Sequence, residues 1–494
     1  MSEFERALEE DLRRGVTGQS GALVNAAWLD PLRLQEPRWK YRTAENKVGG
    51  LILGHRNNGA VGSLDNRHVL TVAGSRGGKG VSLIVPNLLT YEGSVLAMDP
   101  KGELSQITAR ARRAMGQKVV ILEPFPDDGG ASPGSFNPLK EIDPNSKQAK
   151  DDAGQIADAL ITANERDPHW TDSARILVKA LILFTLTLPE DQRHLITVWR
   201  LLNLTHPSVT SVARRSEKNA RFALFKLLQG CAEFDGAVSG AGENFASMAD
   251  KELASVFSSA LTQLEFLSSD AMKDVLIRHD LSLSELKTGK TTLFLSLPAT
   301  RMGTHARWLR VIINLALIAF ERTTVEMDIP LLMVLDEFPV LGHMKSVETA
   351  AGLMAGFGVK LWIVLQDLTQ AKRLYKESWE TFIGNAGIAT FWANADTTTL
   401  AYVSEKLGQT SVELTHSNDL SPQQRQGGAT GRRKEIRVQK LASTDELERM
   451  LDRDLGRVLV LAAGQSPVIV ERFVYYRDQQ FQGLYDAPKN IGSR

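Results

Sequence analysis

Short runs of apolar residues alternate along this chain with longer stretches in which apolar residues recur every three or four positions. The short runs are typical of strands buried on both faces of a parallel sheet, and the longer stretches have the period of amphipathic helices. Strands are expected at residues 69–73, 93–98, 118–122, 291–297, 330–335, 359–365, 388–392 and 457–463. Helices are expected between them at 103–115, 304–322 and 344–357. This alternation predicts an α/β fold with a mostly parallel sheet.

The block between residues 148 and 288 breaks this pattern, because it has helical periodicity and almost no strand signal. Its apolar positions predict helices at 151–163, 171–188, 197–204, 220–227 and 250–267. Since strands resume near residue 291, we expect an all-α domain inserted into the α/β domain.

Two further segments are recognised by their polar residues. Residues 51–54 and 59–62 are expected to form a hairpin, with an Asn-Asn-Gly turn between them. Residues 415–439 are polar, contain glycine and offer little to bury, which predicts a mobile loop. That loop is basic, with Arg425, Arg432, Arg433, Lys434 and Arg437.

The candidate chemistry starts where the first buried strand ends, in a segment with three glycines followed by Lys79. Glycines permit a tight turn that points backbone N–H groups inward at the start of a helix, and the lysine behind them can reach the outer phosphates of a nucleotide. The usual pattern G-x-x-x-x-G-K-[ST] is not met strictly, because Ala73 and Gly80 occupy its first and last positions. A glycine-rich turn without a ligand therefore stays open on this segment alone. The predicted nucleotide-binding residues are Gly74, Ser75, Arg76, Gly77, Gly78, Lys79, Gly80 and Val81.

Two later strands also end in polar residues, at the edge where a parallel sheet presents its ligands. Asp336 and Glu337 follow the strand at 330–335, and Gln366 follows the strand at 359–365. Asp336 is placed to hold Mg²⁺, Glu337 to deprotonate an attacking water, and Gln366 to bind the γ-phosphate or that water. With Lys79 on the β- and γ-phosphates, these roles are nearly all that phosphoryl transfer needs. Their order along the chain predicts an ATP hydrolase of the RecA-like kind.

We therefore expect a RecA-like P-loop nucleotide-binding domain in two parts, with ATP and Mg²⁺ as its ligands. The expected division is a helical or irregular lead-in at 1–45, the first part at 46–147, the all-α domain at 148–288, the second part at 289–480 and a tail at 481–494.

Composition narrows the function classes. Lys plus Arg and Asp plus Glu both number 58, so no global basic field exists to hold nucleic acid, and any such binding needs a local patch or a pore formed by several subunits. The single cysteine, Cys231, excludes an internal disulfide and indicates a reducing compartment. No apolar segment has the roughly 20 residues of a membrane-spanning helix, and the acidic first residues are not those of a secretory signal.

Several motifs together resemble those of the coupling proteins of type IV secretion systems, the TraG-like ATPases of conjugative DNA transfer. The resemblance covers roughly residues 50 to 475 and depends on segments that include Met98-Asp-Pro-Lys-Gly-Glu103, Asp167-Pro-His-Trp170, Val334-Leu-Asp-Glu-Phe338, Leu365-Gln-Asp-Leu-Thr-Gln370 and Phe382-Ile-Gly-Asn-Ala-Gly387, besides the glycine segment at 67–81. In that family the lysine is commonly followed by glycine, so Gly80 is compatible with nucleotide binding. The inner-sphere magnesium ligand then stays unassigned, with Ser82, one turn further on, as a candidate.

The resemblance implies a motor domain that assembles into homo-oligomeric ring hexamers. It implies DNA, single- or double-stranded, with bound relaxase as the cargo, and secretion-channel subunits as partners. The all-α domain would face the cytosol and help to recognise the substrate. Ring ATPases commonly supply an arginine from the neighbouring subunit. Arg67 is the candidate here, because it lies at the start of the phosphate-loop strand, and Arg373 is the second choice.

The chain departs from the family pattern at its start, where members usually have a membrane anchor. Either the sequence has been shortened, or the protein relies on a separate membrane-anchor protein, and the Met-Ser-Glu start favours the second interpretation. We expect a cytoplasmic protein recruited to the cytoplasmic face of the inner membrane. Two other functions stay open: another RecA-like ring translocase of DNA, of the FtsK or HerA type, and a nucleotide-gated substrate receptor without motor activity.

Overall fold

A computed structural model describes residues 26–42, 49–57, 59–126, 133–162, 168–216, 219–417 and 432–487. In these ranges one large sheet has the strand order β2-β1-β13-β12-β9-β3-β8-β7-β4-β6-β5. The seven strands from β9 to β5 run parallel, and the four at the other edge are joined antiparallel. The strands are β1 (Leu51–Arg56), β2 (Gly59–Ser63), β3 (His68–Ala73), β4 (Val95–Asp99), β5 (Lys118–Leu122), β6 (Thr291–Ser296), β7 (Leu331–Leu335), β8 (Val359–Leu365), β9 (Ala386–Trp392), β10 (Gln409–Ser417), β11 (Arg432–Lys440), β12 (Arg457–Ala462) and β13 (Val468–Glu471).

The sheet separates two hydrophobic cores, because successive side chains of a strand point to opposite faces. On β4, Leu96 and Met98 belong to the core that contains the long helix α13, whereas Val95 and Ala97 belong to the core with α2 and α3. Strand β7 is buried at every position, as its continuous apolar run predicts. The helices of the α/β part are α2 (Val85–Thr90), α3 (Glu103–Ala114), α13 (Ala299–Arg322), α14 (Lys345–Leu353), α15 (Leu368–Tyr375), α16 (Thr381–Gly384), α17 (Thr397–Leu407) and α19 (Thr444–Met450).

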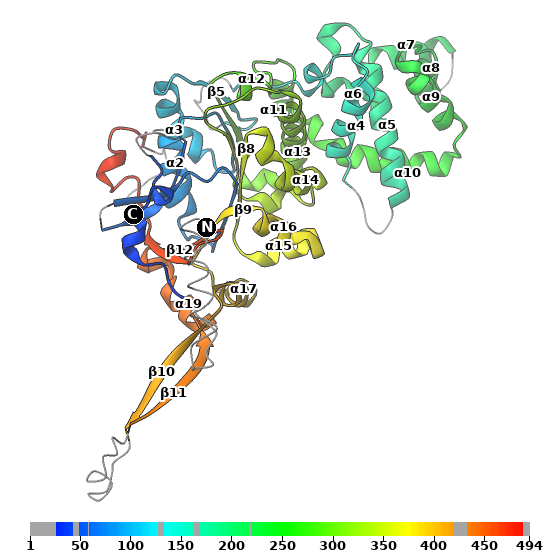
Figure 1. The fold of residues 1–494 in the computed structure, drawn as a ribbon. Helices are drawn as coiled ribbons and strands as arrows, with labels where there is room; N and C mark the ends of the chain where they lie inside the picture. The colour runs from blue at the N-terminus through cyan, green and yellow to red at the C-terminus, as the bar shows by residue number, and fades with distance from the viewer. Residues whose placement is uncertain are drawn as a thin grey trace, which may run out of the picture.

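A block of helices follows β5 and precedes β6 in the chain, and it extends to one side of the sheet (Figure 1). Within it, α5 packs on α4, α10, α6 and α9, and α4 also packs on α13 of the α/β part. The free thiol of Cys231 is buried in this block. The helices are α4 (Ala149–Leu160), α5 (Pro168–Leu186), α6 (Leu195–Leu202), α7 (Pro207–Ser216), α8 (Ala220–Gln229), α9 (Ala237–Ser247), α10 (Asp250–Leu264), α11 (Asp270–Leu276) and α12 (Glu285–Thr288).

The prediction of a mobile loop at 415–439 is wrong at both described ends of that segment, where the structure has the strands β10 and β11. Strands β10 and β11 pair antiparallel over their whole length, and the hairpin projects away from the body beyond α17 (Figure 1). Ile436 and Val438 of β11 are 44% and 47% exposed, and none of residues 435–440, the part of the strand whose side chains are described, is buried. Hydrophobicity therefore did not reveal this strand. Residues 418–431, with Arg425, lie outside the described residues.

Most other expected elements are present with small shifts. The expected hairpin at 51–62 is confirmed as β1 and β2, whereas the helix expected from residue 304 already begins at Ala299. Strand β13 was not predicted. None of the helices in the described ranges has both the length and the apolar character that a bilayer span requires. The predicted α/β fold with a mostly parallel sheet is confirmed.

Candidate active site

The predicted phosphate loop leaves β3 and turns sharply against the end of β9. Gly74 donates its N–H to the Trp392 carbonyl at 3.1 Å, and a β-carbon at Gly74 would lie 1.7 Å from the Ala393 carbonyl oxygen. Only glycine fits there. Arg76 and Gly78 are left-handed, with φ of 57° and 78°. Such residues within a turn direct consecutive N–H groups toward one point, which forms a concavity suited to anions.

The helix that follows this loop begins with one wide turn. Residues Gly80–Ile84 form a π-helix, η3, that runs directly into α2. A β-carbon at Gly80 would meet nothing within 4 Å, so glycine is not required there by space. Ser82 is buried and donates its N–H to the Gly78 carbonyl at 2.8 Å. A β-carbon at Gly78 would lie 3.6 Å from the Ser82 hydroxyl, which places this candidate magnesium ligand beside the loop.

The structure brings four predicted residues from three strand ends together at this loop. The Lys79 ammonium lies 2.9 Å from Asp336 Oδ1 and 2.6 Å from Glu337 Oε1. The other Glu337 oxygen, Oε2, accepts a hydrogen bond from Gln366 Nε2 at 3.0 Å. They meet because β3, β7 and β8 are neighbouring parallel strands whose carboxyl ends lie at one edge.

Backbone geometry directs the Glu337 side chain into this cluster. Glu337 has φ of 52°, a left-handed conformation that is rare for a residue with a side chain, and its N–H donates to Asp336 Oδ1 at 3.0 Å. Gln366 is fixed as well, because its N–H donates to Gln370 Oε1 and its carbonyl accepts from Asn394 Nδ2. A strained residue that the surrounding contacts hold in place is typical of functional sites.

The cluster is largely shielded from solvent, which shifts the pKa values of its members. Burial acts to lower the pKa of Lys79, but the charges of Asp336 and Glu337 outweigh it and raise that pKa. Burial raises the pKa of the Asp336 carboxyl, although the nearby Lys79 acts in the opposite direction. The lysine is therefore held as a cation whose charge the two carboxylates share.

A cavity of about 580 Å³ opens over the loop and contains residues that sequence reasoning did not select. Asp99, at the end of β4, lines it and accepts from the N–H groups of Leu104 and Ser105 at 3.1 and 2.8 Å. Burial raises the pKa of Asp99 to about 6, and the charge of Asp336 adds to this shift. Tyr475, from the C-terminal segment, lines the same cavity. The apolar run before Asp99 is the signal that could have identified it.

Arg472 is a second residue that the sequence did not reveal. It follows β13, and its guanidinium donates to the Gly77 carbonyl of the phosphate loop and to the Arg453 carbonyl. A β-carbon at Gly78 would lie 3.3 Å from its Nη1 atom. Burial lowers the pKa of Arg472. The C-terminal strand thus supports the phosphate loop from behind.

The two candidate arginines for a neighbouring subunit lie outside this cluster. Arg67 binds the Asp65 carboxylate with Nε and Nη2, at 3.0 and 2.5 Å, and its side chain is 52% exposed. It precedes β3 and thus lies on the order of 20 Å from the loop at the other end of that strand, too far to act on its own site. Arg373 is exposed on α15.

A family model described as Type IV secretory system Conjugative DNA transfer matches residues 32–492. The chain belongs to this family. Among curated relatives, Protein VirD4 of Rhizobium radiobacter is 28% identical over 447 residues, which are 86% of this chain and 59% of that protein. Conjugal transfer protein TraG of Agrobacterium fabrum (strain C58 / ATCC 33970) is 26% identical over 428 residues, 84% of this chain and 61% of the relative. The chain thus spans about three fifths of the length of these relatives.

Solved structures of the bacterial conjugative coupling protein TrwB have the same fold. One unbound form of TrwBdeltaN70 has a TM-score of 0.56 and 17% identity, with coverage of 83% of this chain and 85% of the other. The complex of TrwB with ADP and Mg²⁺ has a TM-score of 0.56 and 16% identity, with coverage of 83% and 86%. The predicted RecA-like P-loop fold is confirmed by this likeness, together with the parallel sheet described above.

Proposed function

We propose that this chain is the ATP-hydrolysing coupling subunit of a type IV secretion or conjugation system. It recruits DNA with bound relaxase, or a protein substrate, and drives this cargo towards the transfer channel. The observation that carries the proposal is the contact of Lys79, Asp336, Glu337 and Gln366 at one phosphate loop. The family supports the cargo, because its description names conjugative DNA transfer. Solved structures of TrwB support the nucleotide, because they hold that protein in complex with ADP and Mg²⁺ and with an ATP analogue.

The residues of the cavity fit a magnesium nucleotide. The loop has left-handed residues at Arg76 and Gly78, which suit an anion-binding turn, and one lysine, within a cavity of about 580 Å³. Magnesium is usually held by one or two carboxylates together with substrate phosphates and waters, and Asp336 provides such a carboxylate at the end of β7. Ser82 is a further candidate oxygen ligand, because its hydroxyl would lie 3.6 Å from a β-carbon at Gly78 of the loop. When bound, the ion neutralises charge on the outer phosphates.

The ion pairs of the free protein suggest how hydrolysis proceeds. Lys79 exchanges its carboxylate partners for oxygens of the β- and γ-phosphates when the nucleotide binds. Glu337 then loses its lysine, keeps its hydrogen bond with Gln366, and accepts the proton of an attacking water. Gln366 orients that water or the γ-phosphate. Positioning and charge stabilisation of this kind are the main requirements of phosphoryl transfer.

The proposed partners follow from the same family. We propose a homo-oligomeric ring, with six subunits as the expected number, in which Arg67 or Arg373 reaches the γ-phosphate held by the next subunit. Secretion-channel subunits are the further proposed partners. The proposed location is the cytoplasm, at the cytoplasmic face of the inner membrane.

An ATPase assay of the purified chain, run beside a mass measurement of its oligomer, tests the function. We expect magnesium-dependent hydrolysis that single- or double-stranded DNA accelerates, in a species of several subunits. Hydrolysis that DNA leaves unchanged would count against DNA as the cargo. Nucleotide binding without hydrolysis in the oligomer would reject the motor and support a nucleotide-gated receptor.

A further inference from the structure

A cavity of about 530 Å³ is lined in part by the segments that follow Glu337 and Gln366 in the chain. One wall is α13. Another is formed by the short helix η8 (Phe338–Leu341) with the loop to His343, and a third by the end of α15. Both segments begin within two residues of a proposed catalytic group. A ligand in this cavity would therefore contact the two elements that position Glu337 and Gln366.

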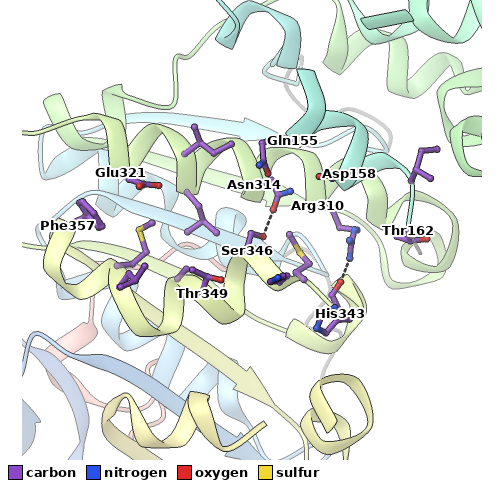
Figure 2. A pocket seen from close by; sticks show the side chains of 18 of the residues that line it. Gln155, Asp158, Thr162, Arg310, Asn314, Glu321, His343, Ser346, Thr349 and Phe357 are labelled. Atoms are coloured by element: carbon purple, nitrogen blue, oxygen red, sulfur yellow. Dashed lines mark hydrogen bonds between the residues drawn. The ribbon is translucent and has the colours of Figure 1, made fainter. Parts of the chain in front are cut away.

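The lining of this cavity has an unbalanced charge. It includes Arg307, Arg310 and Lys376, and among the residues that the structure describes it includes no aspartate or glutamate. A neighbouring cavity of about 670 Å³, shown in Figure 2, shares Thr162, Arg310 and His343 with it but also contains Asp158 and Glu321. Of these two cavities, the one of about 530 Å³ is therefore the one whose described lining has cations and no acidic residue.

Arg310 is a buried cation that has no carboxylate partner within the described ranges. Its side chain donates to the Ala159, Leu341 and His343 carbonyls, and the last of these contacts is visible in Figure 2. Burial lowers its pKa to about 10, which still leaves it charged at neutral pH. Buried charges are normally paired, so a guanidinium held only by carbonyls is a site prepared for an anion.

Arg307 lies one turn earlier on the same helix and, within the described ranges, also has no carboxylate partner. Its Nε atom is buried without a hydrogen-bond partner in the described part of the chain, and its only contact of this kind there is a long one, 3.4 Å, from Nη2 to Gln263. Arg307 and Arg310 lie close enough that the charge of Arg307 acts to lower the pKa of Arg310. Two like charges side by side without an acid favour a ligand that carries concentrated negative charge.

Aromatic contacts tie the walls of the cavity to the catalytic segments. Phe338, the residue after Glu337, stacks on Tyr375 of α15 at 5.7 Å between ring centroids, and Phe382 packs edge-on against both. Arg310 holds the end of η8 through the Leu341 carbonyl. A shift of these walls is therefore transmitted to both strand ends.

We propose that this cavity binds a backbone phosphate of single-stranded nucleic acid through Arg307 and Arg310, and that occupancy is sensed by the hydrolysis centre through η8 and α15. The inference depends on the proposed function for its choice of cargo. Arg310 uses its Nε and Nη1 atoms on carbonyls, so its Nη2 group is the one that would meet a phosphate oxygen, beside the guanidinium of Arg307. Hydrogen bonds from guanidinium to phosphate are charge-assisted and strong. Single strands are commonly held by such positive grooves irrespective of sequence.

Binding of a fluorescently labelled oligothymidine to the full chain, measured by anisotropy over a range of salt concentrations, tests this site. Arg307→Gln removes one charge with little change in size, Arg307→Lys restores the charge, and Arg301→Gln is the matched control on another part of α13. Arg301 instead lies over the Phe125 ring at 5.1 Å. One phosphate contact contributes about fivefold in affinity at 0.1 M salt. It also contributes about 0.7 to the slope with which the logarithm of the affinity falls against the logarithm of the salt concentration.

We expect Arg307→Gln to lose about fivefold in affinity and about 0.7 in slope, with ATP binding and basal hydrolysis unchanged. Arg307→Lys should recover most of the affinity, and Arg301→Gln should bind like the wild type. The DNA concentration for half-maximal stimulation of hydrolysis should rise by the same factor in Arg307→Gln.

Three results would overturn the site. The first is oligothymidine binding that Arg307→Gln does not weaken, and the second is an equal loss of affinity in Arg301→Gln. The third is displacement of the labelled oligothymidine by polyglutamate of the same charge as readily as by unlabelled oligothymidine. The last result would assign the cavity to acidic peptides. The readouts also separate the two proposals. If the chain hydrolyses no ATP but Arg307→Gln still weakens DNA binding, the phosphate site is supported and the motor is refuted. If the chain hydrolyses ATP but Arg307→Gln leaves DNA binding unchanged, only the phosphate site is refuted.

Discussion

Replacing Glu337 with glutamine should make the protein bind ATP more tightly while it almost stops hydrolysing it. In the free protein Glu337 holds Lys79 at 2.6 Å, and the two side chains are 26% and 18% exposed. Lys79 must leave this carboxylate to reach the phosphates. The substitution weakens the contact that competes with the nucleotide and removes the group that accepts the proton of water.

The magnitudes follow from this geometry. A hydrogen bond to a charged group contributes about 1.5–3 kcal/mol. Asp336 stays as a second partner of Lys79 at 2.9 Å, and glutamine still offers an oxygen, so about 1 kcal/mol of competition is expected to disappear. That corresponds to about fivefold tighter ATP binding. Loss of a general base should lower the rate about 10²–10⁴-fold.

Fluorescent-nucleotide titration and single-turnover hydrolysis measure the two effects separately. The matched control is Glu285→Gln, which breaks another lysine–glutamate pair, with Lys118 at 2.7 Å, where β5 begins. That variant should bind and hydrolyse ATP like the wild type. Weaker ATP binding by Glu337→Gln, or hydrolysis at the wild-type rate, would refute the assignment of Glu337 as the base that Lys79 releases.

Three further outcomes are expected. If Arg67 acts on the neighbouring subunit, the rate per subunit rises with protein concentration, and Arg67→Ala loses about 10³-fold in rate without losing ATP affinity; a rate independent of concentration would exclude it. Arg472→Met should weaken ATP binding about tenfold, because the phosphate loop loses a charged hydrogen bond to the Gly77 carbonyl, and an unchanged dissociation constant in the same titration would contradict this role. Burial raises the pKa of Asp99 to about 6 in the folded protein, above its unfolded value, so ionisation of Asp99 lowers the stability of the wild type by about 3 kcal/mol as pH rises from 4 to above 6. In thermal denaturation, the stability of Asp99→Asn relative to the wild type should therefore increase over that range. A stability difference that does not change with pH would argue against the raised pKa.

The sequence was sufficient where the signal is local. Lys79, Glu337 and Gln366 each come after a buried, mostly apolar strand, and the carboxyl ends of parallel strands meet at one edge of a sheet. Their contact could therefore be expected before any coordinates were known. The particular ion pairs could not, because they depend on the left-handed backbone at Glu337.

Features created by distant segments were missed. Arg472 reaches the Gly77 carbonyl across 395 positions of the chain, and no local pattern announces such a contact. Arg307 and Arg310 look like ordinary helix arginines until their surroundings show that carboxylates are missing within the described residues. The hairpin β10–β11 was missed for another reason. None of the side chains described in its strands, at 409–412 and 435–440, is buried, so their alternation of β-branched and polar residues resembles a polar loop.

Steady-state ATP hydrolysis of Lys79→Ala, measured beside Lys118→Ala, shows whether the phosphate loop and its three strand ends form a hydrolytic nucleotide site. Both variants lose one lysine from a lysine–carboxylate pair, the first at the loop and the second where β5 begins. We expect Lys118→Ala to hydrolyse ATP at the wild-type rate. A folded Lys79→Ala should show no hydrolysis above background. Hydrolysis by Lys79→Ala at the wild-type rate would contradict the assignment of this site.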